Sequence, residues 1–188
     1  MTSPVDRVNN LNDLNILTTR LELIPLTADQ LNKYLDQEDA FNKEVGLTSR
    51  VILTDILKRA INIKLTNLVW TKTEEHPWVT YWLIKVPPDG FGAGLIGFKG
   101  VPDLRGVVEI GYGIDPNFQN KGFMTEAVLG LSGWAFEDPR CKQIVAPNTK
   151  RTNLASNRVL EKAGMQIYTE SADCLSWVLD KSWKESHE

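Results

Sequence analysis

The amino-acid sequence predicts one α/β domain whose sheet is mostly antiparallel in its first half and contains a β-α-β crossover in its second half. Apolar residues alternate or run together in six to seven short segments, as in strands, and recur at helical spacing in four longer ones. The order is β-α-α-β-β-β-α-β-α-β-β. A length of 188 residues suits one such domain.

The front half predicts a strand and two helices before its hairpins. Ile16–Leu26 alternates in part and ends near a proline, which is typical of a strand. Thr27–Asp36 opens on a capping threonine and predicts a short amphipathic helix, and a second helix is expected over Arg50–Leu65, capped by Thr48 or Ser49. The three strands expected next, separated by proline-containing turns, are Trp78–Val86, Gly94–Val101 and Val107–Ile114.

The back half alternates between the two kinds of element. Helices are expected over Lys121–Phe136 and Asn153–Ala163, with the short strand Lys142–Ala146 between them. Two final strands are predicted over Gln166–Glu170 and Cys174–Leu179.

Composition excludes several classes of protein. A net charge of −3 argues against a protein that coats nucleic acid. Two cysteines are too few for a disulfide scaffold, and two histidines argue against a metal site. No stretch approaches the ~18 apolar residues of a membrane helix. Residues 1–15 are polar and lack a signal-peptide core, so we expect a flexible segment there, one domain over residues 16–183, and a cytoplasmic protein.

The segment Glu109–Glu126 carries the clearest chemical signal. A predicted strand ends, a short loop follows, and Gln119–Met124 leads into an apolar helix. The free N–H groups and partial positive charge of a helix start favour an anion such as a phosphate. Gly122 would let that ligand approach the backbone, and Lys121 would add a cation. The alternative is that Gly122 only eases the junction between loop and helix.

Two motifs extend this signal. Gln119 and Gly122, with Met124 two residues on, resemble the acetyl-CoA-binding pattern Gln/Arg-x-x-Gly-x-Gly/Ala of the GCN5-related N-acetyltransferases (GNAT superfamily), in which Met124 replaces a small residue. Asn148–Met165 is similar to the Asn-x-x-Ser…Leu-Glu-Lys-x-Gly-Phe stretch of the RimJ/RimL-type ribosomal-protein branch, and Leu17–Leu23 is similar to the first strand of that branch.

The resemblance implies a fold, a cosubstrate and a binding site. The GNAT fold is a mixed, mostly antiparallel sheet of six to seven strands with four helices and a splayed, V-shaped central cleft. The cosubstrate would be acetyl-CoA, with no metal. The residues that the resemblance places in cofactor binding are Tyr112, Ile114, Gln119, Asn120, Lys121, Gly122, Phe123, Met124, Thr125, Asn153 and Ser156.

It also implies acetyl transfer to a primary amine, on a protein N-terminus or a small molecule, by direct attack in a ternary complex. The amine must be neutral to attack, so Glu109 is the candidate base, directly or through water; an ordinary solvent-facing or ion-paired glutamate is the alternative. A backbone N–H near Tyr112–Ile114 would meet the developing oxyanion. The chain could act as a monomer or a homodimer, with no nucleic-acid or membrane partner.

The proton for the departing thiolate is assigned to Ser156, because Leu160 stands where many family members have a tyrosine. The alternatives are that Ser156 bonds back to a helix carbonyl and that Asn153 only caps the helix.

The rival function is a non-catalytic acyl-CoA-binding or regulatory domain on the same fold. A loose basic cluster is either a solvated rim or a grip on the 3′-phosphate of CoA; its members are Arg140, Lys142, Lys150 and Arg151.

Overall fold

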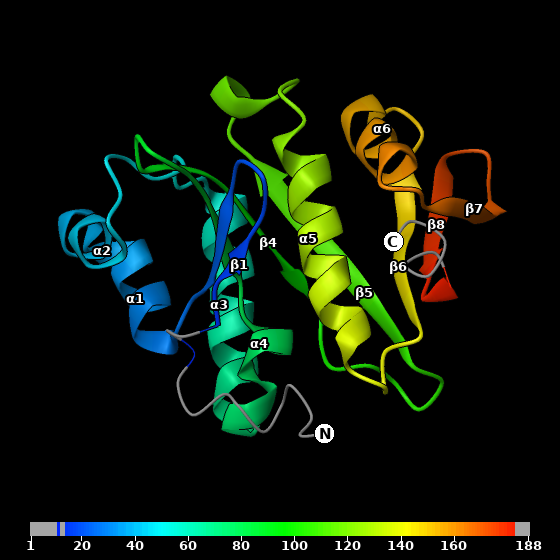
Figure 1. The fold of residues 1–188 in the computed structure, drawn as a ribbon, viewed down its shortest axis with the longest axis horizontal. Coiled ribbons are helices and arrows are strands. Elements are labelled where there is room, and N and C mark those ends of the chain that lie inside the picture. Colours follow the sequence, from blue (N-terminus) through cyan, green and yellow to red (C-terminus); the bar gives the residue numbers. More distant parts are fainter. Residues whose placement is uncertain (1–10, 12–13, 183–188) are drawn as a thin grey trace.

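The computed structural model describes residue 11 and residues 14–182 (Figure 1). The predicted flexible segment, residues 1–15, lies almost wholly outside the described residues, as does residue 183 at the end of the predicted domain. The elements, in chain order, are β1 (Ile16–Leu17), β2 (Glu22–Pro25), α1 (Ala28–Asp36), α2 (Glu38–Val45), α3 (Asp55–Trp70), the 3-10 turn η3 (Thr73–Glu75), α4 (His76–Val79), β3 (Trp82–Val86), β4 (Phe91–Phe98), β5 (Val107–Ile114), the 3-10 turn η4 (Pro116–Phe118), α5 (Phe123–Glu137), β6 (Gln143–Lys150), α6 (Leu154–Lys162), β7 (Gln166–Glu170) and β8 (Cys174–Asp180).

The strands form one sheet in the order β1-β2-β3-β4-β5-β6-β8-β7. Every neighbouring pair is antiparallel except β5 and β6, which run parallel because the crossover helix α5 joins them. The predicted mixed, mostly antiparallel sheet with a β-α-β crossover in its second half is therefore confirmed.

The structure has more elements than the sequence predicts. The described residues form eight strands and six complete α-helices, against six to seven strands and four helices expected. The predicted strand Ile16–Leu26 is two strands, since a turn at residues 18–21 separates β1 from β2. Helix α2 was not predicted, although Gly46 ends it in the left-handed conformation usual for a helix C-terminus. The short helix α4 was also missed, and α3 is capped by Thr54 instead of Thr48 or Ser49.

Helix α5 covers one face of the sheet through a cluster of aromatic rings. The ring centre of Trp134 lies 5.2 Å from that of Trp82 on β3 and 6.4 Å from that of Phe98 on β4. It also lies 4.7 Å from the ring centre of Trp78 on α4. Figure 1 shows α5 running across the central strands, so this cluster fixes the helix over the middle of the sheet.

Helix α3 packs against the opposite face. Successive residues of a strand point to opposite faces, so a side chain at Gly97 would point away from the face that Phe98 shares with α5. A Cβ atom there would lie 3.5 Å from the ring of Tyr81. The Nζ atom of Lys64 in α3 stands 5.1 Å from the centre of that same ring. The sheet is thus sandwiched between α5 on one side and α3 on the other.

Lys64 is a buried lysine that has no carboxylate partner among the described residues. Its Nζ atom donates a hydrogen bond to the carbonyl oxygen of Phe98, at the end of β4. Burial, and to a lesser extent the nearby charge of Lys99, lowers the pKa of Lys64 to about 8. The folded protein therefore favours the neutral amine more strongly than the unfolded chain does.

Raising the pH should stabilise the protein through Lys64. Between about pH 8 and the ordinary lysine value of 10.5, the unfolded chain holds the proton that the folded state has released. The free energy of unfolding should therefore rise with pH there, by at most about 1.4 kcal/mol per pH unit. In urea denaturation from pH 7 to 10, Lys64→Met should remove this rise, whereas Lys58→Met, at an exposed position on the same helix, should keep it. Parallel curves for the wild type and Lys64→Met would contradict the prediction.

Candidate active site

Strand β5 separates from β6 after three residue pairs. The parallel pairing joins Val107–Glu109 to Gln143–Val145 and then stops, whereas β5 keeps its antiparallel partner β4 as far as Ile114. Figure 1 shows β5 and β6 diverging toward the end of the sheet where α5 begins. Within the described part of the chain, the edge of β5 from Ile110 onward has no partner strand. This is the V-shaped separation that the resemblance implies.

Main-chain groups of β5 point to this open edge. On the side of β4, the carbonyl oxygen of Glu109 accepts from the N–H of Lys99 over 2.9 Å, and the N–H of Asp115 donates to the carbonyl oxygen of Ala93 over 2.8 Å. In an antiparallel pair such residues alternate with residues whose N–H and C=O groups point the other way. Tyr112 and Ile114 belong to the alternate set. Their N–H and C=O groups therefore point to the open edge, where the sequence analysis places the cosubstrate.

One face of β5 is bare beside that edge. Glu109, Gly111 and Gly113 share this face, and a Cβ atom added at either glycine would meet nothing within 4 Å. The carboxylate of Glu109 forms an ion pair with the ammonium group of Lys99 on the neighbouring segment of chain, and about a third of it is exposed. Glu109 therefore lies at the point where β5 and β6 part, paired but open to solvent.

In the loop between β5 and α5, the backbone N–H groups of residues 120–122 have no hydrogen-bond partner among the described residues. Asn120 and Gly122 have φ angles of 60° and 79°, in the left-handed region, and residues 119–122 are exposed. Helix α5 then begins at Phe123, so the N–H groups of its first turn, through Thr125, lack partners within the helix. Such a run of unpartnered N–H groups on exposed residues is suited to an anion.

The side chains of the loop leave this N–H surface open. Met124, the departure from the family pattern, is only 4 % exposed and packs into the core. Its large side chain therefore does not cover the N–H groups of the loop. The Nζ atom of Lys121 stands 5.3 Å from the ring centre of Phe118 and has no carboxylate partner among the described residues. Lys121 therefore supplies an unpaired cation beside the loop.

A turn from the other end of the chain docks on this loop, which the sequence analysis missed. The turn at residues 18–21 supplies three hydrogen bonds to the carboxylate of Glu126 in the first turn of α5. Arg20 also donates from Nη1 to the carbonyl oxygen of Lys121, over 2.9 Å. Arg20 lies in Leu17–Leu23, which is similar to the first strand of the family branch, and Glu126 ends the segment Glu109–Glu126, but nothing in either run shows that the two meet.

The start of α6 lies on the opposite side of the open edge from Glu109. The side-chain oxygen of Asn153 accepts a hydrogen bond from the N–H of Ser156 over 3.1 Å, which makes Asn153 the helix cap. The hydroxyl of Tyr112 donates to the carbonyl oxygen of Ser156 over 3.3 Å. Because Tyr112 and Glu109 point to opposite faces of β5, the two predicted catalytic residues, Glu109 and Ser156, flank the edge from its two sides.

The side chains of Leu160 and Tyr112 show which residue near α6 can supply a tyrosine hydroxyl. Leu160 is 1 % exposed and belongs to the core. The phenol of Tyr112, which the sequence analysis valued only for its backbone, is the tyrosine hydroxyl that reaches the first turn of α6. Burial raises the pKa of Tyr112 to about 12, so the phenol stays protonated and is a hydrogen-bond donor at neutral pH. Among the described residues, the hydroxyl of Ser156 makes no hydrogen bond to the protein.

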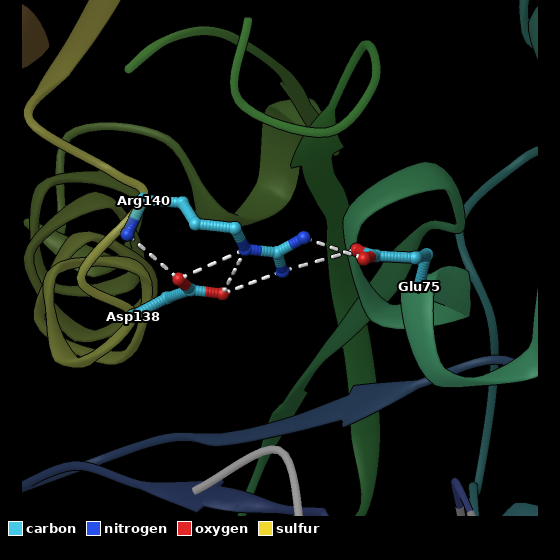
Figure 2. Close-up of polar contacts among 3 residues, drawn as sticks. All are labelled: Glu75, Asp138 and Arg140. Carbon is cyan, nitrogen blue, oxygen red and sulfur yellow. Dashed lines mark hydrogen bonds and ion pairs between the residues drawn. The ribbon is translucent and has the colours of Figure 1, made fainter. Parts of the chain in front are cut away.

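Two arginines of the loose basic cluster are held by carboxylates. Figure 2 shows the guanidinium of Arg140 between the carboxylates of Asp138 and Glu75, with N···O contacts as short as 2.6 Å to each. Arg140 follows the C-terminus of α5, about 22 Å from the loop at the start of this helix. Arg151 pairs with Glu170. For Arg140 and Arg151, these pairings favour the alternative of a solvated, ion-paired rim over a grip on the 3′-phosphate of CoA.

Two further properties of the described residues bear on the site. In residue 11 and residues 14–182, no group of three or more His, Cys, Asp or Glu side chains could hold a metal ion. In the same part of the chain, no helix has the length and apolar character that crossing a membrane requires.

Comparison with known proteins identifies the family. The family described as "Acetyltransferase (GNAT) domain" matches residues 20–166, which include β5, the loop and α6. The chain belongs to the GNAT acetyltransferase family. The uncharacterized N-acetyltransferase YjdG of Bacillus subtilis (strain 168) is 34 % identical to it over 98 residues, 52 % of this chain. The chain spans only 57 % of the length of that relative.

Solved structures support the GNAT fold. RimL, a ribosomal L7/L12 alpha-N-protein acetyltransferase in complex with coenzyme A, superposes with a TM-score of 0.62 and 18 % identity, over 88 % of this chain and 97 % of RimL. A GNAT-family acetyltransferase from Bacillus anthracis gives a TM-score of 0.61 and 18 % identity, over 90 % of this chain and 99 % of that one. At such identities the likeness establishes the fold.

The Arg140 bridge should stabilise this GNAT domain in a pH-dependent way. Burial alone would raise the pKa of Asp138, but the hydrogen bonds from Arg140 outweigh it and hold that pKa below its usual value. Arg140→Gln should therefore lower the free energy of unfolding by about 1–2 kcal/mol at pH 7, less than for a fully buried pair because the guanidinium is half-exposed.

This stabilisation is present above the unfolded pKa of Asp138 and is lost as the pH falls through the folded one, so the difference between wild type and Arg140→Gln should shrink toward pH 3. Urea denaturation at pH 3.5, 5 and 7 measures it. Arg105→Gln, which removes an exposed arginine paired with Asp103, should cost much less at pH 7. Equal losses for the two variants would show that the bridge contributes no more than a surface pair.

Proposed function

We propose that this chain is an acetyl-CoA-dependent N-acetyltransferase, which moves an acetyl group to a primary amine by direct attack in a ternary complex. One observation carries the proposal: the unpaired edge of β5 leads directly to the N–H-rich loop at the start of α5. An arm containing amide groups can pair with a free strand edge, and a pyrophosphate can bind the N–H groups of a helix start. The edge and the loop therefore suit the two halves of CoA in the right order.

The residues present fit this ligand. Tyr112 and Ile114 offer N–H and C=O groups to the pantetheine arm, and Gly111 and Gly113 place no side chain beside it. The loop offers its backbone N–H groups and the unpaired Lys121 to the phosphates. Acetyl-CoA supplies the chemistry of an activated acetyl thioester when bound.

In this proposal Glu109 removes a proton from the acceptor ammonium group, and the neutral amine that remains is the nucleophile. Its carboxylate already binds one primary ammonium group, that of Lys99. An acceptor amine would replace Lys99 there, and the carboxylate would take its proton directly or through water. A backbone N–H of β5 near Tyr112 would stabilise the developing oxyanion.

The opposite side of the edge serves the departing thiolate. The hydroxyl of Ser156 is free of protein partners among the described residues and would donate a proton or a hydrogen bond. Asn153 holds the helix start in place as its cap. Glu109 then takes a proton from the amine on one side of β5, and on the other side Ser156 gives its proton to the thiolate and regains one from solvent.

The acceptor class is a primary amine, of a protein N-terminus or of a small molecule. The structural neighbour RimL, whose name states alpha-N-protein acetylation, supports testing peptide N-termini alongside small amines. We place the catalytic unit in one domain over residues 16–183, because the described strands form one sheet and the buried apolar residues form one cluster.

Ligand binding tests the cosubstrate first. Thermal unfolding with acetyl-CoA, CoA, ATP and NAD in parallel should show stabilisation by both CoA species alone. A ligand at about 100 times its dissociation constant adds about 2.7 kcal/mol, which is several degrees for a protein of this size. The absence of a shift with either CoA species would overturn the proposal.

The role of Glu109 is tested by Glu109→Gln. Turnover, followed by thiol release with a panel of amines, should fall by about 10²–10⁴-fold while CoA binding survives. Glu22→Gln is the matched control, because Glu22 is also a strand glutamate paired with a lysine on the next strand, Lys85. Unchanged turnover in Glu109→Gln at saturating acceptor would remove Glu109 from the mechanism. CoA binding without acetyl transfer to any amine would favour the non-catalytic acyl-CoA-binding function.

A further inference from the structure

We propose that Arg20 is a positioning residue for the CoA-binding loop: it sets the direction in which the N–H group of Gly122 points. This inference rests on the proposed function. It assigns a role in cosubstrate binding to the turn at residues 18–21, which lies about a hundred residues before the loop in the sequence. It does not require Arg20 to touch the cosubstrate.

The turn is anchored on one carboxylate. Glu126 accepts hydrogen bonds from the hydroxyl of Thr18 at 2.6 Å, from the backbone N–H of Arg20 at 2.7 Å and from its Nε at 2.7 Å. Burial would raise the pKa of Glu126, but these bonds keep it below its usual value, so the carboxylate stays ionised. The backbone and side chain of Arg20 are therefore both held at the first turn of α5.

From this anchor the guanidinium of Arg20 reaches over the loop. Its Nη1 donates to the carbonyl oxygen of Lys121 at 2.9 Å, and its Cζ lies 4.8 Å from the ring centre of Phe123. Its Nη2 would lie 3.2 Å from a Cβ atom at Gly122. The guanidinium thus covers one side of the loop and holds one peptide group of it.

That peptide group joins Lys121 to Gly122. A trans peptide is planar, and its C=O and N–H groups point in opposite directions. Because Arg20 binds the carbonyl of Lys121, the N–H of Gly122 is held pointing away from Arg20, to the other side of the loop. Gly122 has a left-handed φ of 79° and no side chain, so without this bond the peptide group could turn more freely.

Arg20 does not contribute a free positive charge to the loop. Glu126 neutralises the guanidinium, whereas Lys121 has no carboxylate partner among the described residues. Arg20 is therefore expected to act through geometry, and its loss should weaken only ligands that use the N–H groups of the loop.

Isothermal titration of the full chain with CoA, and ligand-detected NMR with pantetheine, test this inference. Arg20→Gln should raise the dissociation constant of CoA by roughly tenfold, as expected when one charge-assisted hydrogen bond no longer orders the site. Pantetheine lacks the pyrophosphate, so its affinity should stay the same. Arg20→Lys, which keeps the charge and can still reach a single partner, should recover part of the CoA affinity and carries the test if Arg20→Gln does not fold.

Arg140→Gln is the matched control. It removes the arginine that ties down the other end of the same helix, so it should lower the melting temperature without changing the dissociation constant of CoA. Unchanged CoA affinity in both Arg20 variants, or equal loss of CoA and pantetheine affinity, would overturn the inference alone. Failure of the wild type to bind CoA would overturn the proposed function, and this inference with it.

Discussion

The unequal pairing of β5 is the constraint on which the rest of the site depends. Strand β4 takes up one edge of β5 over its whole second half, but β6 pairs with the other edge over only three residues. On its other edge β6 pairs with β8 from Gln143 to Lys150, with an irregularity between Ala146 and Thr149. Backbone groups left without a strand partner must be met by water or by a ligand. The fold therefore keeps a row of directed donors and acceptors available at its centre.

The parallel direction of β5 and β6 decides what surrounds that row. Parallel strands have their carboxyl ends at the same side of a sheet, and each of these two strands is followed by a helix. The loop before α5 and the capped start of α6 therefore meet at the open end of the separation (Figure 1). Two helix N-termini, with their unpaired N–H groups, are brought to one place by topology. In an entirely antiparallel sheet they would lie at opposite ends.

Local patterns predicted the elements whose signals lie within a few residues. The helices that became α1, α5 and α6 were expected because each shows helical spacing of apolar residues, and the antiparallel order of β3, β4 and β5 follows from short turns. The split of Ile16–Leu26 was missed because its cause is distant: the turn at residues 18–21 is held by Glu126, which is 108 residues from Thr18. Helix α2 was missed although Phe41 and Val45 lie on one face, because most of its other residues are polar and the apolar spacing is weak.

For the site, the alternation of residues along β5 was readable, and with it the common face of Glu109, Gly111 and Gly113. The burial of Met124 also follows from the sequence, because its helical spacing places it on one apolar face with Val128, Leu131 and Ala135, and the structure buries all four. Sequence proximity was misleading for Arg140, which sits at the far end of α5 between two carboxylates (Figure 2). The contact of Tyr112 with the start of α6 joins residues 44 positions apart and has no local signal.

The anchoring of the β1–β2 turn also has a consequence for the order of folding on the ribosome. Arg20 and its partner Glu126 are separated by 106 residues, so the turn leaves the ribosome long before the carboxylate that completes it. At about 5–20 residues per second, roughly 5–20 s pass between the two. During that interval the turn has its local hydrogen bonds between Thr18 and Leu21 but lacks the carboxylate that anchors Thr18 and Arg20. The N-terminal strands therefore reach their final form only after α5 has been made, and the loop that we assign to CoA is assembled in the same late step.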